Sequence, residues 1–349
     1  MGFVQSQHEH AMYRRGGDGK AIMLVGVYVD DLVITGSSLE AVQQFKAEMK
    51  SAFLMSDLGL LSFYLGIEVR QDEGGISLRQ AHYAKKILEV ASMENCKGAV
   101  TPMEERLRLS RDSKAPEVDA THYRRIVGSL RYLVHTRPDL SFAVGYVSRF
   151  LERPTEEHLQ AVKRILRYIA GTLEYGLRYG RHTGEARLLG YCDSDLAGDI
   201  DTRKSTTGAM FFLGNCLVSW QSLKQRVVAL SSCEAEYVAA TTAATQALWM
   251  ARLLGELFGR EPAVVELKVD SKSALALAKN PVFHERSKPI DVRYHFIRDC
   301  LTEGSVSATY ISTTDQLADI LTKALGRVKF HELRARIGMV QITSPGHMD

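Results

Sequence analysis

The second half of the chain switches repeatedly between the twofold periodicity of strands and the longer periodicity of helices, and this order limits the possible folds most strongly. Three strand-like segments come first, a long helical segment follows, and strands and helices then alternate. Such an order predicts a mixed α/β sandwich in which helices cover a sheet. The predicted strands are 187–193, 208–213, 216–220, 264–270 and 305–311, and the predicted helices are 232–258, 272–279, 291–303 and 315–325.

Carboxylates stand at the ends of these predicted elements. Asp193 and Asp195 lie two residues apart on one strand, so both are expected on the same face. Glu234 falls in the first turn of the long helix, Asp270 ends a strand, and Asp319 lies one turn into the last helix. Acids that converge from separate elements suit a two-metal phosphodiester site, because two hard cations about 3.5–4 Å apart need oxygen ligands.

Each acid also has a purely structural interpretation. Ser231 and Glu234 fit a capping box at the start of the long helix. Asp270 could cap the helix that follows it, and Asp319 could pair with Lys323 one turn later. Four acids on four successive elements still favour a catalytic interpretation, because their like charges would repel unless metal ions neutralised them.

The first half begins with two β-branched runs around Asp30 and Asp31, which predict a β-hairpin at 21–35. Further along, the pattern predicts helices at 39–54 and 81–93, strands at 61–69 and 75–79, a linker or long loop at 97–118, and mainly helix at 120–180.

Composition excludes several classes of protein. The 349 residues are 45% hydrophobic and 24% charged, which excludes a disordered chain and suggests two or three domains. The longest apolar run, Ala21–Val29, is far shorter than the roughly 18 residues of a membrane helix, and no signal segment opens the chain. We therefore expect an intracellular protein with no membrane partner. Five scattered cysteines argue against a disulfide framework or a zinc cluster.

The sequence strings around the acids resemble one family. In order along the chain, they are GYCDSDLAGD, TRKSTTGAMFFLG, VSWQSLKQ, VALSSCEAEYVA, VDSKSAL, HFIRD and DQLADILTK. They resemble the ribonuclease H domain of copia-type LTR retrotransposon polyproteins. The catalytic, metal-binding acids that this resemblance implies, for two Mg²⁺ or Mn²⁺ ions, are Asp193, Glu234, Asp270 and Asp319. Asp195 and Glu236 fall outside that set and are expected to support it or to lie at the surface.

The first half resembles the same polyproteins. GVYVDDLVITG, with Asp30 and Asp31, resembles the Tyr-x-Asp-Asp hairpin of reverse transcriptases, and YRRIVGSLRYLVHTRPDLSFAVGYVSRF resembles the thumb and connection region. The whole chain is then expected to be an α/β (α+β) protein. Its expected parts are a truncated reverse-transcriptase palm at 1–70, a thumb/connection-like helical region at 71–185, a ribonuclease H-like mixed-sheet domain at 186–330 and a frayed tail at 331–349.

The resemblance implies hydrolysis of the RNA strand of RNA–DNA hybrids, with other parts of a Pol polyprotein as partners and a cytoplasmic (virus-like particle) or nuclear location. Four residues depart from the family pattern and leave substrate fit open: Leu196, Leu223, Arg226 and Pro289. The alternatives are a catalytically inactive nucleic-acid-binding remnant and an inert genomic fragment. An integrase agrees less well with SSCEAEY and QLADILTK.

Two groups of side chains are candidates for contact with the hybrid backbone. The first group carries a local excess of positive charge between 119 and 185 and comprises Arg124, Arg125, Arg131, Lys163, Arg164 and Arg167. The second group comprises His284, Arg286, Lys288, Arg293 and Arg298. Ordinary solvated charge is the rival interpretation for both. His284 is the better candidate for a proton shuttle, and His295 is expected to pack structurally.

Polymerase activity is not expected from the chain alone. In the family a third Asp from an earlier strand completes the polymerase metal site, and the only acids before Asp30 are Glu9 and Asp18. We predict that the purified chain with Mg²⁺ does not extend a primer on an RNA template, because half of the metal cage would be missing. Primer extension that disappears in Asp30→Asn would contradict this prediction.

Overall fold

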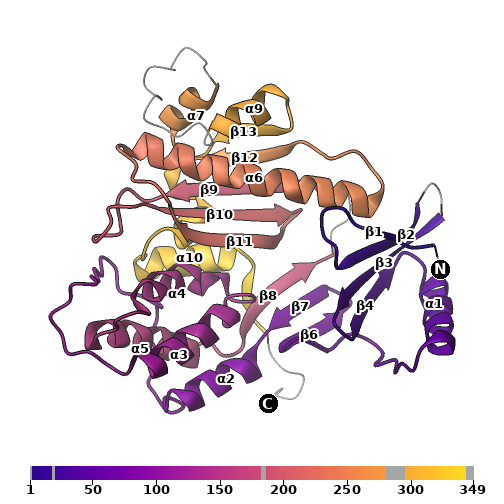
Figure 1. Cartoon of the computed structure of the whole chain (residues 1–349), viewed down its shortest axis with the longest axis horizontal. Helices are drawn as coiled ribbons and strands as arrows, with labels where there is room; N and C mark the ends of the chain where they lie inside the picture. Colours follow the sequence, from indigo (N-terminus) through magenta and orange to yellow (C-terminus); the bar gives the residue numbers. More distant parts are fainter. Residues whose placement is uncertain (1, 18–19, 182–185, 280–294, 343–349) are drawn as a thin grey trace.

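Three β-sheets organise the chain, and helices pack most densely around one of them (Figure 1). The computed structural model describes residues 2–17, 20–181, 186–279 and 295–342. The first sheet is antiparallel and joins β1 (Val4–Gln5), β2 (Met12–Gly17), β3 (Lys20–Tyr28) and β4 (Asp31–Gly36). The predicted hairpin is confirmed, since β3 and β4 meet at the turn Val29–Asp30. Helix α1 (Leu39–Ala52) packs on this sheet through Phe45.

A second antiparallel sheet links segments that are distant in sequence. Its strand order is β14 (Met339–Gln341), β8 (Tyr175–Gly180), β7 (Gly75–Arg79), β6 (Ile67–Asp72) and β5 (Phe63–Tyr64). Helix α2 (Ala81–Val90) follows β7 in the chain. Two expectations were wrong here. Residues 175–180 form a strand after the helical region, and the tail is ordered through residue 342. Leu333 and Ile337 at the end of α10 (Arg327–Arg336) are fully buried, and Met339 pairs with Leu177, so hydrophobic burial offsets the entropy of ordering the tail.

The third sheet confirms the predicted mixed α/β pattern. Its strand order is β11 (Cys216–Lys224), β10 (Thr206–Leu213), β9 (Leu188–Ser194), β12 (Val265–Val269) and β13 (Val306–Tyr310). The first three strands are antiparallel, and β9, β12 and β13 run parallel. Its helices are α6 (Ser232–Phe258), α7 (Lys272–Lys279) and α9 (Phe296–Thr302).

The helix predicted at 315–325 is replaced by two short 3₁₀ turns, η5 (Thr313–Asp315) and η6 (Leu317–Leu321). Gln316 between them has an extended backbone, and its side chain forms two hydrogen bonds. Its side chain accepts a hydrogen bond from Ala318 N and donates one of 2.8 Å to Cys192 O on β9. This tie to the sheet competes with a continuous helix.

The third sheet is buried on both faces. Along β10, Ala209 and Phe211 contact the hydrophobic cluster formed with α6, and Met210 and Phe212 contact the opposite cluster. That opposite cluster contains residues of α3 (Ala120–Leu133), α4 (Ser141–Val147) and α5 (Glu156–Ala170). Figure 1 shows these helices and α6 on opposite sides of the sheet. The helices that precede residue 185 therefore share a hydrophobic core with strands that follow residue 186.

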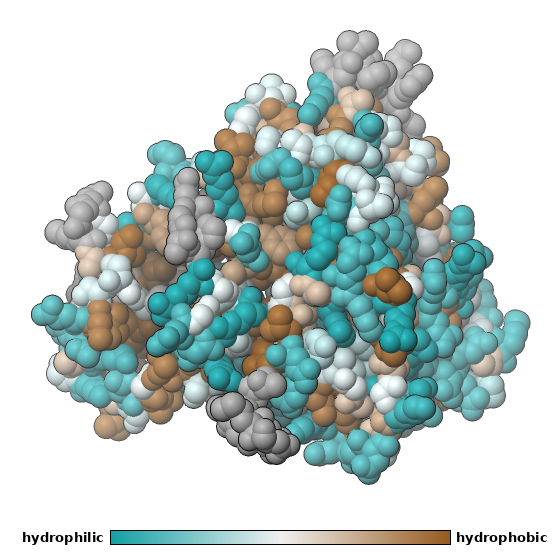
Figure 2. Space-filling view, turned by 180° about the vertical axis from the view of Figure 1, so that it is seen from behind, coloured by the Kyte–Doolittle hydropathy of each residue, from teal (hydrophilic) through white to brown (hydrophobic). Residues whose placement is uncertain are grey.

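Exposed hydrophobic side chains are prominent in the N-terminal part. Val29, Leu54, Leu58 and Leu60 are all largely exposed. In the view from behind, most of the visible surface is hydrophilic and hydrophobic side chains lie in separate groups (Figure 2). None of the described helices combines the length and hydrophobicity needed to span a membrane.

A buried ion pair joins the helical region to the end of the chain. Arg137 bonds both carboxylate oxygens of Asp139 at 2.9 Å and also donates to Thr172. The Tyr168 hydroxyl donates to Asp139 and accepts from Arg334 of α10. Every member of this network is satisfied, which is the condition under which a buried ion pair is tolerated.

Arg137→Met tests this network. The variant is expected to lose about 3–5 kcal/mol of unfolding free energy, because Asp139 would remain buried without a countercharge. Urea unfolding followed by circular dichroism measures the loss. Arg153→Met is the matched control, since its ion pair with Glu117 is exposed on both sides and should change stability by less than about 1 kcal/mol. Equal effects of the two substitutions would contradict the assignment.

Candidate metal centre

Strand β9 carries Asp193 into the middle of the third sheet. It pairs with β10 on one side and β12 on the other, and Asp193 is only 2% exposed. The residue of β10 that pairs with Asp193 is Gly208. A Cβ at Gly208 would lie 2.7 Å from a methyl carbon of Thr322 and 2.9 Å from Ala318 O, so the missing side chain allows η6 to approach the sheet. This close approach places the segment with Asp319 beside Asp193.

Three carboxylates converge at this end of the sheet. Asp193, Glu236 and Asp270 each offer an oxygen, and these oxygens lie within 4.8 Å of one another. Glu236 comes from the start of α6, and Asp270 directly follows β12. Within the described ranges, no other group of three or more His, Cys, Asp or Glu side chains has a geometry suited to one metal ion.

The structure brings Glu236, and not Glu234, into this group. Glu234 accepts a hydrogen bond of 2.8 Å from Leu230 N, and its own N–H donates to Ser231 Oγ at 3.2 Å. The Ser231 side chain thus caps the helix as the structural interpretation expected, but the Glu234 carboxylate accepts from Leu230 N and not from Ser231 N, so only half of the capping box forms. Two positions along a helix turn by about 200°, so the two glutamates point to different sides.

Glu236 is 7% exposed, which also overturns the expectation that it might be a surface acid. The helical periodicity of the sequence could have identified Glu236 as a buried residue. Glu236, Ala240, Ala243 and Ala247 recur at helical spacing and form one buried stripe along α6. The residues of this stripe face the sheet, and a carboxylate at its first position is carried toward the strand ends.

Asp319 lies beside Asp193 on the η6 side. Its Oδ1 is 2.8 Å from Lys323 Nζ, and the same ammonium is 3.9 Å from Asp193 Oδ2. Thr322 Oγ1 donates a hydrogen bond to Asp193 Oδ2. Asp319 therefore pairs with Lys323, as the structural interpretation of the sequence expected. It also lies close to Asp193, as the metal-binding interpretation expected.

Burial and mutual repulsion shift the ionisation of these groups. Burial, then Asp193 and Asp270, raise the pKa of Glu236 to about 10. Burial and Asp193 likewise raise the pKa of Asp319 to about 7 and raise that of Asp270. Burial by itself would lower the pKa of Lys323. Asp193 and Asp319 stabilise the charged ammonium more strongly, so the pKa of Lys323 is raised. Without a bound cation, Glu236 is therefore expected to hold a proton at neutral pH.

The donor set fits a hard divalent cation. Glu236 Oε2 and Asp270 Oδ1 are buried without a hydrogen-bond partner. Buried carboxylate oxygens are normally satisfied, so two unpartnered oxygens in one group indicate a place for a cation. Oxygen ligands of this kind suit Mg²⁺ or Mn²⁺.

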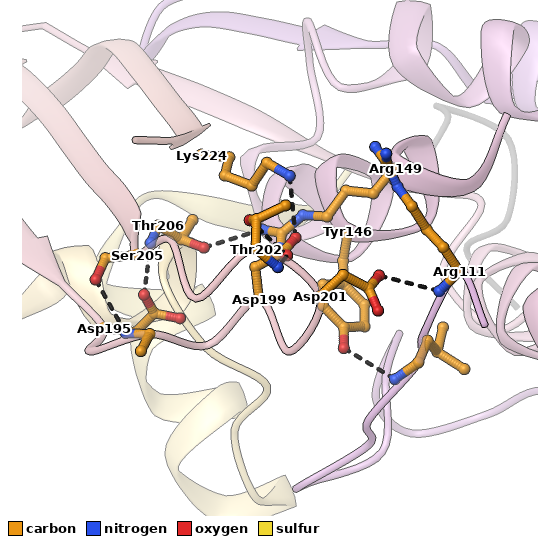
Figure 3. Close-up of polar contacts among 12 residues, drawn as sticks. Arg111, Tyr146, Arg149, Asp195, Asp199, Asp201, Thr202, Ser205, Thr206 and Lys224 are labelled. Carbon is orange, nitrogen blue, oxygen red and sulfur yellow. Dashed lines mark hydrogen bonds and ion pairs between the residues drawn. The ribbon is translucent and has the colours of Figure 1, made fainter. Parts of the chain in front are cut away.

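Polar and charged side chains fix the loop that follows β9 (Figure 3). The strand ends at Ser194, so Asp195 leaves it and accepts a hydrogen bond of 2.5 Å from Thr206 N. Burial raises the pKa of Asp195 to about 6. Asp195 is therefore held by Thr206 N and is not a member of the group of carboxylates that contains Asp193, although their spacing had predicted a shared face.

Asp199 is the centre of that loop. It accepts hydrogen bonds from Thr202, from Lys224 at 3.1 Å, and from Arg149 at 3.2 Å. Against the effect of burial, bonds from Thr202 and Lys224 lower the pKa of Asp199 to about 2. Arg149 belongs to η2 (Ser148–Phe150) in the helical region and also donates to Thr206 Oγ1. The exit from β9 is thereby tied to the helices on the far side of the core (Figure 3).

The basic side chains expected to contact nucleic acid differ in their surroundings. Arg124, Arg164 and Arg167 bond Leu151 O, Glu104 and Lys97 O. Arg125, Arg131 and Lys163 are exposed on α3 and α5. Arg298 donates to Leu277 O, and His295 Nδ1 lies 2.9 Å from the Tyr237 hydroxyl, which agrees with a packing role. His284, Arg286, Lys288, Pro289 and Arg293 lie outside the described residues.

Asp30 and Asp31 lie at the tip of the β3–β4 hairpin and are exposed. They are not members of the carboxylate group described above.

Comparison with known proteins identifies the family. The profile described as "Reverse transcriptase (RNA-dependent DNA polymerase)" matches residues 1–105. The Pol polyprotein of transposon RE1 from Arabidopsis thaliana is 40% identical over 98% of this chain, and a putative Ty5-1 transposon protein of Saccharomyces cerevisiae is 33% identical over 69% of this chain and 79% of its own length. The chain belongs to the copia-type retrotransposon Pol polyproteins. It spans 23% of the length of the Arabidopsis polyprotein.

A solved RNase H1 from the archaeon Halobacterium salinarum aligns with 39% of this Pol chain and 94% of its own chain, at 18% identity and a TM-score of 0.27. The family profile and the strand order together agree with a reverse-transcriptase part followed by a ribonuclease H-like part.

The ionisation of Glu236 gives a prediction for the metal-free Pol chain. Its pKa is about 10 in the folded state and about 4.5 as a free side chain, so the folded state retains a proton that the unfolded state has released between these pH values. Stability in EDTA should therefore fall as pH rises from 6 to 8, with a contribution of about 1.4 kcal/mol per pH unit from one proton.

Glu236→Gln should reduce this slope and be more stable than the unmodified chain at pH 8, and Glu234→Gln should keep the original slope. Urea unfolding at several pH values measures the slopes. Identical slopes in the unmodified chain and Glu236→Gln would show that Glu236 is not a protonated buried carboxyl group.

Proposed function

We propose that this Pol chain hydrolyses the RNA strand of RNA–DNA hybrids with a divalent cation, Mg²⁺ or Mn²⁺. The observation that carries this proposal is the convergence of Asp193, Glu236 and Asp270 within 4.8 Å, with two of their buried oxygens unpartnered. Membership in a family of reverse-transcribing elements supports the choice of an RNA–DNA hybrid as the substrate, because reverse transcription generates such hybrids.

The roles of the acids follow from their positions. Asp193 lies within the triad and also beside Asp319, so it is the residue that would contact both cations. Glu236 and Asp270 would complete one cation site, and Asp319 the other. Two divalent ions, when bound, supply an activated water and neutralise charge on the reacting phosphate.

The remaining contacts belong to substrate binding. The exposed Arg125, Arg131 and Lys163 would contact phosphates of the hybrid backbone. Selection of the RNA strand would depend on its 2′-hydroxyl groups, which DNA lacks. Other parts of a Pol polyprotein, within the cell, are the proposed protein partners, and the exposed hydrophobic residues of the N-terminal part are available to them.

Cleavage of a labelled RNA–DNA hybrid tests the proposal. Asp193→Asn, Asp270→Asn and Glu236→Gln are each expected to lower the Mg²⁺-dependent rate by at least about 100-fold, because each removes a carboxylate that would hold a cation. Glu234→Gln is the matched control two residues away and should retain most of the rate, since the Glu234 carboxylate bonds Leu230 N and is not a member of the triad.

Cleavage that survives Asp193→Asn and Asp270→Asn would refute the site. Loss in Glu234→Gln, with full activity in Glu236→Gln, would restore the original assignment from sequence. Salt-sensitive hybrid binding without cleavage by the unmodified chain would instead favour an inactive nucleic-acid-binding remnant.

A further inference from the structure

A lysine lies among the carboxylates at the place where the proposed function requires a second cation. Lys323 follows η6 closely, and its Nζ is 2.8 Å from Asp319 Oδ1 and 3.9 Å from Asp193 Oδ2. Asp193 is also a member of the triad with Glu236 and Asp270. One carboxylate thus takes part both in the triad and in an ion-pair cluster that already holds a positive charge.

The ammonium group compensates charge that would otherwise be buried alone. Asp193 and Asp319 are 2% and 5% exposed, and their like charges repel at short range. Lys323 approaches both of them and relieves this repulsion. Thr322, next to it in sequence, donates to Asp193, so two consecutive side chains of this segment hold the same carboxylate.

The Lys323 side chain can also move away from the two acids into solvent. Its side chain is 42% exposed, in contrast to the acids that it contacts. The charge is carried on a flexible four-carbon stem with rotatable donors, so the ammonium can withdraw into solvent without movement of the backbone.

We propose that Lys323 is a built-in counter-ion that occupies the second cation position until a divalent ion displaces it. This inference rests on the proposed function, because it assumes that a divalent ion binds between Asp193 and Asp319. The ammonium and the ion compete for the same carboxylates, so Lys323 weakens binding of the second ion. Lys323 is in this sense a positioning residue, which keeps Asp319 beside Asp193 before metal arrives.

Titration of the full chain with Mn²⁺, with free Mn²⁺ followed by electron paramagnetic resonance, tests this competition. The unmodified chain should bind two ions, the second more weakly. Lys323→Met should tighten the second ion by about tenfold or more and leave the first nearly unchanged, because the competing charge is gone. Lys323→Arg retains a charge and should keep the second ion weak.

Amine acetylation followed by mass spectrometry gives a second readout on the unmodified chain. Lys323 should be acetylated slowly in EDTA and several-fold faster with saturating Mn²⁺, because displacement exposes its amine. Lys268, which pairs with Glu266 at 2.6 Å and with Thr309, is the internal control and should react equally in both conditions.

The outcomes separate the two proposals. If Lys323→Met binds the second ion no more tightly than the unmodified chain does, and Mn²⁺ does not change Lys323 labelling, the counter-ion inference is wrong while the metal site stands. If the unmodified chain binds no Mn²⁺ and behaves like Asp270→Asn, the proposed function itself is wrong.

Discussion

Mutual repulsion of buried carboxylates is the constraint on which the arrangement of the ribonuclease H-like part depends. Asp193, Glu236, Asp270 and Asp319 come from four different elements and would separate if those elements were free to move. Strand β9 is central in its sheet, α6 packs on one face, and η6 approaches the other. Hydrophobic burial on both faces therefore supplies the energy that holds the acids together.

The same packing explains why the helical region before residue 185 belongs with the ribonuclease H-like part. Its helices form the core that covers the η6 face of the sheet, and Arg149 fixes the loop where β9 ends. The N-terminal sheet is attached to α6, since Ser6 Oγ donates to Glu256 at 2.8 Å and Trp249 donates to His8 O at 3.0 Å. Contacts thus connect the reverse-transcriptase part to the helix that carries Glu236.

The sequence was informative where periodicity and local chemistry decide the structure. The mixed sheet, the hairpin around Asp30 and the long helix α6 all follow from apolar spacing. The same spacing identifies Glu236 as the start of a buried stripe, but motif matching alone selected Glu234. Periodicity could not reveal the strand at 175–180, whose pairing with β7 and β14 depends on contacts with distant segments. The break at Gln316 likewise depends on a hydrogen bond to β9.

The central claim is that Asp193, Glu236 and Asp270 together bind a divalent cation. The most direct measurement is an anomalous difference map from crystals of the full chain soaked in Mn²⁺. A peak in direct contact with all three carboxylates is the result that this account predicts. A map with no peak among these carboxylates, or with a peak at Glu234 instead, would contradict it.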